Sequence, residues 1–236
     1  MERFVIEGNF PYSNRHFFVQ HLVPYVFFKH LCQGKHILEI GTGDGFGSFY
    51  LSQGSCAVVA LDLDFSRSQC LKRLIEGARA VNIHFVNADA LALPFLSHSF
   101  DAVIACQVIE HIPQDRLTCF LAEIHRVLKD DGACLLVTLN VENNIKNAAT
   151  YEKFYQHHKE FNKQELHGAV SEIFPSVEVF GLGVSLRHRV FRRLKRWGIR
   201  VESFYEHIVP GDFSVTRDVS RHSLDLFALC RKGEPE

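Results

Sequence analysis

Short, almost continuously apolar runs alternate with longer amphipathic segments over most of the chain. The runs predict strands over 36–40, 56–63, 83–88, 100–106, 133–139, 177–182 and 223–230. Between two of them, Leu117, Phe120, Leu121, Ile124 and Leu128 fall on one face of a predicted helix. Strands that are apolar at nearly every position are covered on both faces, as in a parallel sheet between helices. The pattern therefore predicts a three-layer α/β/α fold.

Three parts of the chain depart from this alternation of strands and helices. The N-terminal part is rich in aromatic residues and predicts one or two helices, in which Pro24 marks a break or a helix start. Two later segments are too long for ordinary connections. We therefore predict one domain, with an N-terminal helical lid, a core and two substrate-side insertions. These parts are 1–34, 35–140, 141–162 and 186–222 of the single domain 1–236.

Composition narrows the class of protein without identifying it. The 236 residues are 47% hydrophobic and 22% charged, which is typical of soluble globular proteins. The formal net charge of −1 provides no overall field toward nucleic acid, so no nucleic-acid partner is predicted. Seven cysteines that form no C-x-x-C pair indicate free thiols in a reducing compartment. Since no signal-like or membrane-spanning run is present, we expect a cytoplasmic protein. No metal site is predicted.

The first predicted strand runs into a glycine-rich loop, "EIGTGDGFG" at 39–47. The dinucleotide motif G-x-G-x-x-G fails, because Phe46 or Ser48 stands at its sixth position. The phosphate loop fails because no lysine follows the loop. The failed dinucleotide motif also disfavours a nicotinamide oxidoreductase. The loop does fit acid-x-G-x-G-x-G. Glycines there permit positive φ and let a ligand approach the backbone, while the acid suits an ammonium or a sugar hydroxyl.

Two further acids follow the next two predicted strands. Asp62 ends "VVALDLD" and Asp89 lies in "NADALALPF". Ligands of parallel α/β folds bind at the carboxyl ends of the strands. The glycine loop and the two acids are therefore expected to form one binding site, with Asp62 placed to bind ribose hydroxyls and Asp89 to bind an adenine edge.

At this point the sequence resembles a family. "ILEIGTGDGFGSFYL", "VVALDLD", "NADALALPF" and "FDAVIACQVIEHIP" are similar to successive motifs of class I S-adenosylmethionine-dependent methyltransferases of the type 11-like group. The resemblance covers roughly 35–140. It implies a Rossmann-like, doubly wound, seven-stranded sheet that is mostly parallel with an antiparallel last strand. It also implies S-adenosylmethionine as cofactor, S-adenosylhomocysteine as product, and transfer to a small molecule or a glycan- or lipid-linked intermediate, with oxygen favoured as the acceptor.

The resemblance also implies roles for individual residues. The glycines would surround the methionine moiety, Glu39 would steady its ammonium group, and Asp62 would accept from the ribose hydroxyls. Leu63 would pack on the adenine, whose edge Asp89 and the Ala90 backbone would bind, and Gln107 would face the methionine. Thr42 stands in the loop where the family frequently has cysteine. The predicted cofactor-binding residues are Glu39, Gly41, Thr42, Gly43, Gly45, Asp62, Leu63, Asp89, Ala90 and Gln107.

Three histidines are candidates for action on the acceptor. Transfer to oxygen often needs a base that titrates near neutral pH, and histidine suits this role. His111 follows the fourth predicted strand, and His157 and His158 lie in the aromatic-rich segment after the fifth. A structural alternative stays open for each: the pair Glu110-His111 would orient its loop, and the other two would be solvated histidines on a lid. A non-catalytic cofactor-binding scaffold also stays open.

The stretch "RHRVFRRLKRWGIR" at 187–200 holds seven Lys and Arg residues and no acid. Its apolar positions fall at helical spacing, so it predicts a basic amphipathic helix. Two interpretations stay open. The apolar face packs into the core, or the helix meets an anionic substrate or a membrane surface. The sequence leaves the oligomeric state undecided.

Overall fold

The computed structural model of the protein describes residues 15–67, 69, 71–72, 76, 82–145 and 151–233. Its strands are β1 (His36–Ile40), β2 (Ala57–Asp62), β3 (Ile83–Asn87), β4 (Phe100–Cys106), β5 (Leu128–Leu139), β6 (Ser176–Val184), β7 (Phe213–Thr216) and β8 (Asp225–Arg231). Its α-helices are α1 (Arg15–Phe28), α2 (Phe46–Ser52), α4 (Leu117–Val127), α5 (Val141–Asn144), α6 (Lys163–Ser171), α7 (Leu186–Arg196) and α8 (Glu202–Glu206). Short 3-10 helices cover Lys29–Leu31, Ile109–His111, Gln114–Arg116 and Pro210–Asp212.

The chain divides into two compact units. The larger contains residues 24–183 and 214–236, and the smaller contains the N-terminal residues up to 23 together with 184–213. Each unit is described by itself below. The predicted division into a lid, a core and two insertions stays a prediction.

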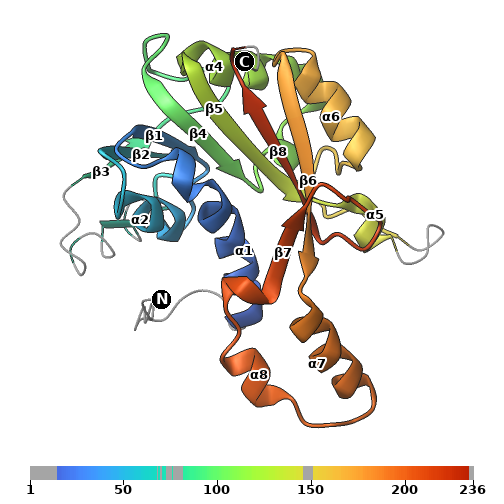
Figure 1. Ribbon diagram of the computed structural model, residues 1–236. Helices are drawn as coiled ribbons and strands as arrows, with labels where there is room; N and C mark the ends of the chain where they lie inside the picture. The colour runs from blue at the N-terminus through green and yellow to red at the C-terminus, as the bar shows by residue number, and fades with distance from the viewer. Residues whose placement is uncertain are drawn as a thin grey trace. The chain divides into compact units, whose positions relative to one another are not determined.

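The larger unit is built on one sheet with strand order β3-β2-β1-β4-β5-β8-β6-β7 (Figure 1). Strands β1 to β5 pair in parallel, whereas β8 pairs antiparallel with both β5 and β6. The predicted Rossmann-like, mostly parallel fold with an antiparallel last strand is therefore confirmed. The described residues contain one strand more than the seven predicted, because β7 forms within the segment predicted as an insertion.

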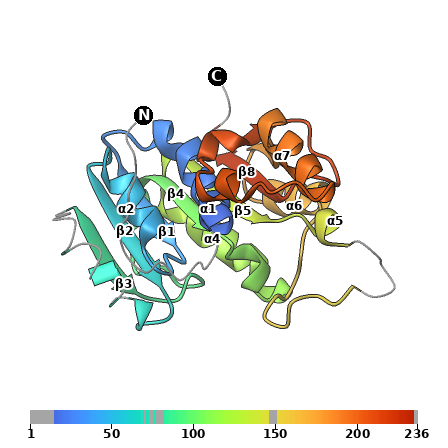
Figure 2. The same ribbon diagram turned by 90° about the horizontal axis from the view of Figure 1, so that it is seen from below.

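Helices cover both faces of this sheet, and Figure 2 shows α2 and α4 on opposite sides. Helix α4 buries Phe120, Leu121 and Ile124 completely, in the same cluster as Leu38 of β1 and Val170 of α6. Burying one such side chain stabilises a fold by about 1.5–3 kcal/mol. Three of the five predicted apolar positions thus fix this layer, whereas Leu128, also predicted for the helix, begins β5.

Helix α1 continues through Pro24, which corrects the expectation of a break or a helix start there. A proline inside a helix lacks the N–H of one backbone hydrogen bond. Tyr25 and Phe28, directly after it, are 4% and 0% exposed. Packing of these rings therefore outweighs the missing bond, and the helix runs unbroken from Arg15 to Phe28.

The smaller unit is held together by aromatic rings and one ion pair. The ring of Phe191 stacks on that of Phe204, with centroids 4.1 Å apart. His188 is buried and packs edge-on against His16, with centroids 5.1 Å apart. Arg187 bonds to the buried carboxylate of Asp212 at 3.0 Å. The predicted basic helix is confirmed as α7. Within the described part of the chain, no helix has both the length and the apolar character needed to cross a bilayer.

Acid is expected to loosen this smaller unit. Burial, together with the charges of His188, Arg192 and Lys195, lowers the pKa of His16 from 6.5 to about 4. Because the folded-state pKa is below the unfolded value, the contribution of neutral His16 is complete above pH 6.5 and is lost as the pH falls toward 4. His16 is only partly buried, so water screens these effects and we expect a loss of only about 1 kcal/mol between pH 7 and pH 5.

Hydrogen exchange of peptides from 184–213, corrected for intrinsic rates, measures this loss directly. In the His16→Gln variant, the difference in the protection of these peptides between pH 7 and pH 5 should be smaller than in the parent. An unchanged difference in that variant would show that His16 is not the group responsible.

Candidate functional site

The candidate site residues follow the ends of parallel strands in the larger unit. Glu39 and Asp62 lie at the carboxyl ends of β1 and β2, Asp89 lies two residues after β3, and Gln107 directly follows β4. Because these strands are parallel, their carboxyl ends meet at one edge of the sheet. The topology thus brings the predicted cofactor-binding residues to a single edge.

The three loop glycines all have positive φ, of 73°, 52° and 83° for Gly41, Gly43 and Gly45. They differ in what a side chain would meet. A Cβ on Gly41 would lie 2.5 Å from Val108, and one on Gly45 would lie 2.5 Å from Leu71. A Cβ on Gly43 would have no described atom within 4 Å. Gly41 and Gly45 therefore serve close packing of the loop, while Gly43 borders the space that a ligand would need.

Glu39 is fully buried and forms the centre of a hydrogen-bond network. The Tyr25 hydroxyl donates to Glu39 Oε1 at 2.6 Å, Thr42 Oγ1 donates to Oε2 at 3.0 Å, and the Ser48 hydroxyl also donates to Oε2. Burial raises the pKa of Glu39, and these hydrogen bonds oppose the increase. The carboxylate thus ties α1, the glycine loop and α2 together, whether or not it also reaches an ammonium group.

The two following acids are positioned by backbone N–H groups. Asp62 Oδ2 accepts from the Gly43 N–H at 2.9 Å, so the second strand end is joined to the loop. Asp89 Oδ1 accepts from the Leu91 N–H at 2.9 Å, and its side chain is exposed. Leu63 is 72% exposed although it is a large apolar side chain. An exposed leucine between two acids fits an adenosine, which has one apolar face and several polar edges.

The remaining cofactor candidates are less clearly placed for contact. Thr42 is 3% exposed and is engaged with Glu39, and Ala90 is half-buried. Gln107 has a φ of 55°, and its N–H donates to the Val137 carbonyl at 2.8 Å. A positive φ at a residue other than glycine is uncommon and frequently marks a functional position. The cofactor contacts of all these residues stay predictions.

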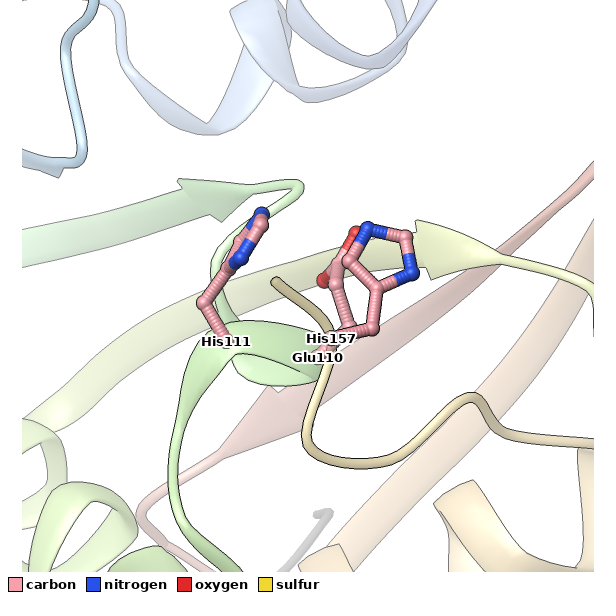
Figure 3. A group of neighbouring side chains, drawn as sticks. All are labelled: Glu110, His111 and His157. Atoms are coloured by element: carbon pink, nitrogen blue, oxygen red, sulfur yellow. The ribbon is translucent and has the colours of Figure 1, made fainter. Parts of the chain in front are cut away.

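A second group of side chains lies just beyond β4. Glu110, His111 and His157 each present a ligand atom, and these atoms lie within 4.8 Å of one another. Figure 3 shows the two imidazole rings and the Glu110 carboxylate gathered at one point. The structure thus brings together two of the three predicted histidines, in the company of a glutamate.

Backbone bonds return the segment after β5 to this place. The N–H groups of His158 and Lys159 donate to the Glu110 carbonyl at 2.7 and 3.3 Å, and the Val141 N–H donates to the Phe161 carbonyl at 3.0 Å. His158 contributes this backbone contact, but its side chain is exposed and is not one of the three clustered groups.

The two clustered histidines are oriented by different acceptors. His111 Nδ1 lies 3.1 Å from the Gln156 carbonyl, and His157 Nδ1 lies 2.6 Å from Glu160 Oε1. Each Nδ1 therefore carries the hydrogen, which leaves Nε2 of each ring with its lone pair. Tyr151 also donates to Glu160, whose charge raises the Tyr151 pKa beyond the effect of burial, to about 12.

Burial shifts the two neighbouring groups on the β4 side in the direction of neutrality. Together with the charges of Asp225 and Glu160, it raises the pKa of Glu110 to about 7. It also lowers the pKa of His111. Sequence reasoning placed Glu110 only beside His111 and did not identify Glu160. The available signal was the i, i+3 spacing of His157 and Glu160 on a segment that returns to the sheet.

Comparisons with known proteins show what the chain is similar to. Residues 38–136 match a family model described as a methyltransferase domain. A probable S-adenosylmethionine-dependent methyltransferase of Mycolicibacterium smegmatis is 30% identical over 128 residues, which are 54% of this chain and 47% of that protein. Phthiotriol/phenolphthiotriol dimycocerosates methyltransferase 1 of Mycobacterium ulcerans is 33% identical over 112 residues, 48% of this chain and 40% of that protein. The match thus spans less than half the length of either relative.

Among solved structures, an S-adenosylmethionine-dependent methyltransferase from Thermotoga maritima matches with a TM-score of 0.65 at 17% identity. The match covers 92% of this chain and 91% of that one, and it shows a common fold. The fold and the match over 38–136 thus make this part of the chain similar to S-adenosylmethionine-dependent methyltransferases, and the cofactor that this similarity implies is S-adenosylmethionine.

Proposed function

We propose that the protein transfers a methyl group from S-adenosylmethionine to an oxygen of a small molecule or of a glycan- or lipid-linked acceptor. The observation that carries this proposal is the pairing of two groups in the larger unit. One is the loop with open space at Gly43, beside Asp62; the other is the Glu110-His111-His157 cluster after β4. Gly41 packs on Val108, two residues before Glu110, so the two groups are near neighbours.

The bound cofactor supplies an electrophilic methyl group on a sulfonium. The residues of this chain contribute binding, orientation and proton transfer. Asp62 and Asp89 are placed to hold the nucleoside. Because His111 has its Nδ1 hydrogen engaged by Gln156, its Nε2 can accept the proton of an acceptor hydroxyl. His111 is exposed, as a base that meets an incoming acceptor has to be.

Calorimetry and turnover together test this function. S-adenosylhomocysteine should bind one-to-one, and a panel of hydroxylated acceptors should reveal methyl transfer. His111→Gln should keep this binding while kcat falls at least about 100-fold, since general-base catalysis contributes about 10²–10⁴-fold. Binding without turnover on any acceptor would favour the non-catalytic scaffold, and absence of binding would contradict both functions.

Helix α7 supports an anionic or membrane-associated acceptor. Leu186, Val190 and Trp197 are 75%, 50% and 70% exposed, and they recur at helical spacing along one stripe. The same stretch, 187–200, carries seven basic residues. Exposed apolar side chains beside arginines are typical of helices that lie in a membrane interface. One curated relative is named for methylation of a dimycocerosate, which agrees with a lipid-linked acceptor.

Trp197 is the single tryptophan of the chain, so its fluorescence reports on α7 alone. With vesicles that contain phosphatidylserine, its emission should shift to the blue as the ring leaves water, and 0.5 M salt should reduce the shift. Purely zwitterionic vesicles serve as the control and should produce a much smaller shift. Unchanged emission with both vesicle types would exclude membrane contact through this helix.

A further inference from the structure

The carboxylate of Glu110 has an unusual environment. Its side chain is fully buried, and among the described residues neither oxygen has a hydrogen-bond partner of good geometry, although the Thr138 hydroxyl and the N–H of Glu110 itself are near enough to oppose the increase in its pKa. A buried carboxylate without partners is costly, and native proteins normally supply a hydrogen bond, an opposite charge or a metal ion. The charges of Asp225 and Glu160 are near enough to raise its pKa, so the surroundings attract a cation rather than another anion. Glu110 therefore lacks the cationic partner that its environment calls for.

Both neighbouring histidines have the arrangement of metal ligands. A ligating imidazole usually donates its other N–H to a carbonyl or a carboxylate, which fixes the ring and its tautomer. His111 directs Nδ1 at the Gln156 carbonyl, and His157 directs Nδ1 at the Glu160 carboxylate. The Nε2 atom of each ring is left as the ligand atom. In Figure 3 both rings lie beside the Glu110 carboxylate.

The separations also suit one ion. Nitrogen and oxygen ligands lie about 2.0–2.2 Å from a zinc-sized cation, so two of them are separated by about 3–4 Å around it. The ligand atoms of Glu110, His111 and His157 are within 4.8 Å of one another, so small side-chain rotations complete the site. His111 is exposed, which leaves an entry path and open coordination positions.

We propose that Glu110, His111 and His157 bind one divalent cation of the borderline class, such as Zn²⁺, Co²⁺ or Ni²⁺. Two imidazoles and one carboxylate are typical ligands for these ions, whereas Mg²⁺ and Ca²⁺ prefer oxygen ligands alone. The sequence did not predict this site, because 46 positions separate His111 from His157 and only the returning segment joins them.

The role of the cation, unlike its binding, rests on the proposed function. A cation at this place would bind the acceptor oxygen and lower the pKa of its hydroxyl, with the proton lost to solvent. It would thereby perform the task assigned above to His111. An acceptor with two adjacent oxygens would then bind better than one with a single hydroxyl, since it can fill two open positions.

Cobalt provides the test, because Co²⁺ bound by nitrogen and oxygen has a visible spectrum that reports its ligands. The chelator-treated protein is titrated with Co²⁺, followed by absorbance and calorimetry. We expect one ion whose affinity depends on the cluster, and at least a 10-fold loss in His157→Gln and in Glu110→Gln. His158→Gln, which alters the adjacent exposed histidine, is the matched control and should bind like the parent. Circular dichroism verifies that each variant is folded.

Two results would overturn the proposal: no Co²⁺ binding to the folded parent, or equal binding by the parent and His157→Gln. Glu110→Gln offers an independent readout, because an amide removes the buried charge. Without metal this variant should melt at the same temperature as the parent or higher, and Zn²⁺ should raise the melting temperature of the parent alone. S-adenosylhomocysteine binding, measured on the same chelated samples, separates failure of the metal site from failure of the proposed function.

Discussion

Asp62→Ala is expected to weaken S-adenosylhomocysteine binding by roughly 100-fold or more. A carboxylate that accepts from two ribose hydroxyls forms two charge-assisted hydrogen bonds, each contributing about 1.5–3 kcal/mol. Asp62 also accepts from the Gly43 N–H, so its loss releases the loop at the point that borders open space. Calorimetric titration measures the change. The lower affinity should arise mainly from a faster dissociation of S-adenosylhomocysteine, because the association rate varies little among related variants.

Asp64→Ala is the matched control. This exposed acid lies two residues further on, and it contacts Ser66 and Arg67 rather than the glycine loop. Its removal should change the affinity less than about threefold, because exposed ion pairs contribute little. Similar losses in both variants would mean that overall negative charge, rather than the placement of Asp62, governs binding.

Gly47→Ala is expected to destabilise the protein by about 3 kcal/mol, although alanine is the better helix former. Gly47 lies in α2, and a Cβ there would overlap the Tyr25 ring and Glu39 Oε1. Overpacking costs about 1–3 kcal/mol, and losing the buried Tyr25–Glu39 hydrogen bond adds about 1.5–3 kcal/mol. The gain in helix propensity offsets only about 1 kcal/mol. Thermal unfolding should show a melting temperature lower by about 6–10 °C.

Gly43→Ala provides the contrast. Its Cβ meets no described atom within 4 Å, and the only penalty is the positive φ of 52°, which costs about 1 kcal/mol. We expect near-parental stability with strongly reduced S-adenosylhomocysteine binding, because the methyl group enters ligand space. If Gly47→Ala melted like the parent, the Tyr25–Glu39 contact would have to be far more adaptable than its geometry indicates.

The sheet was predictable because its signal is local. The strands predicted over 36–40 and 100–106 agree with β1 and β4 at both ends, since an unbroken apolar run needs burial on both faces whatever surrounds it. Other boundaries depended on tertiary contacts. The predicted strand over 133–139 begins earlier, at Leu128, because β5 already pairs with β4 there, where Leu128 lies opposite Phe100.

In the candidate site, too, some residues have a local sequence signal and others depend on tertiary contacts. Glu39, Asp62 and Asp89 could be identified because each follows a predicted strand. The contacts of Glu39 could not be predicted, because its partner Tyr25 lies on a distant helix, and the predicted N-terminal lid carried no signal for the residue that reaches Glu39. The cluster at Glu110 depends on a chain return after β5, which only the backbone bonds to the Glu110 carbonyl specify. Long-range pairing of this kind leaves no periodic signal.

The position of β8 has a consequence for synthesis on the ribosome. Strand β8 is the last in the chain, yet it lies between β5 and β6 and pairs with both. Until Arg231 has emerged from the ribosome, β5 and β6 each have one edge whose backbone N–H and C=O groups lack their β8 partner. The parallel strands can assemble before β8 is made, whereas the sheet closes only after β8 has emerged, so β5 and β6 need protection from wrong strand partners until then.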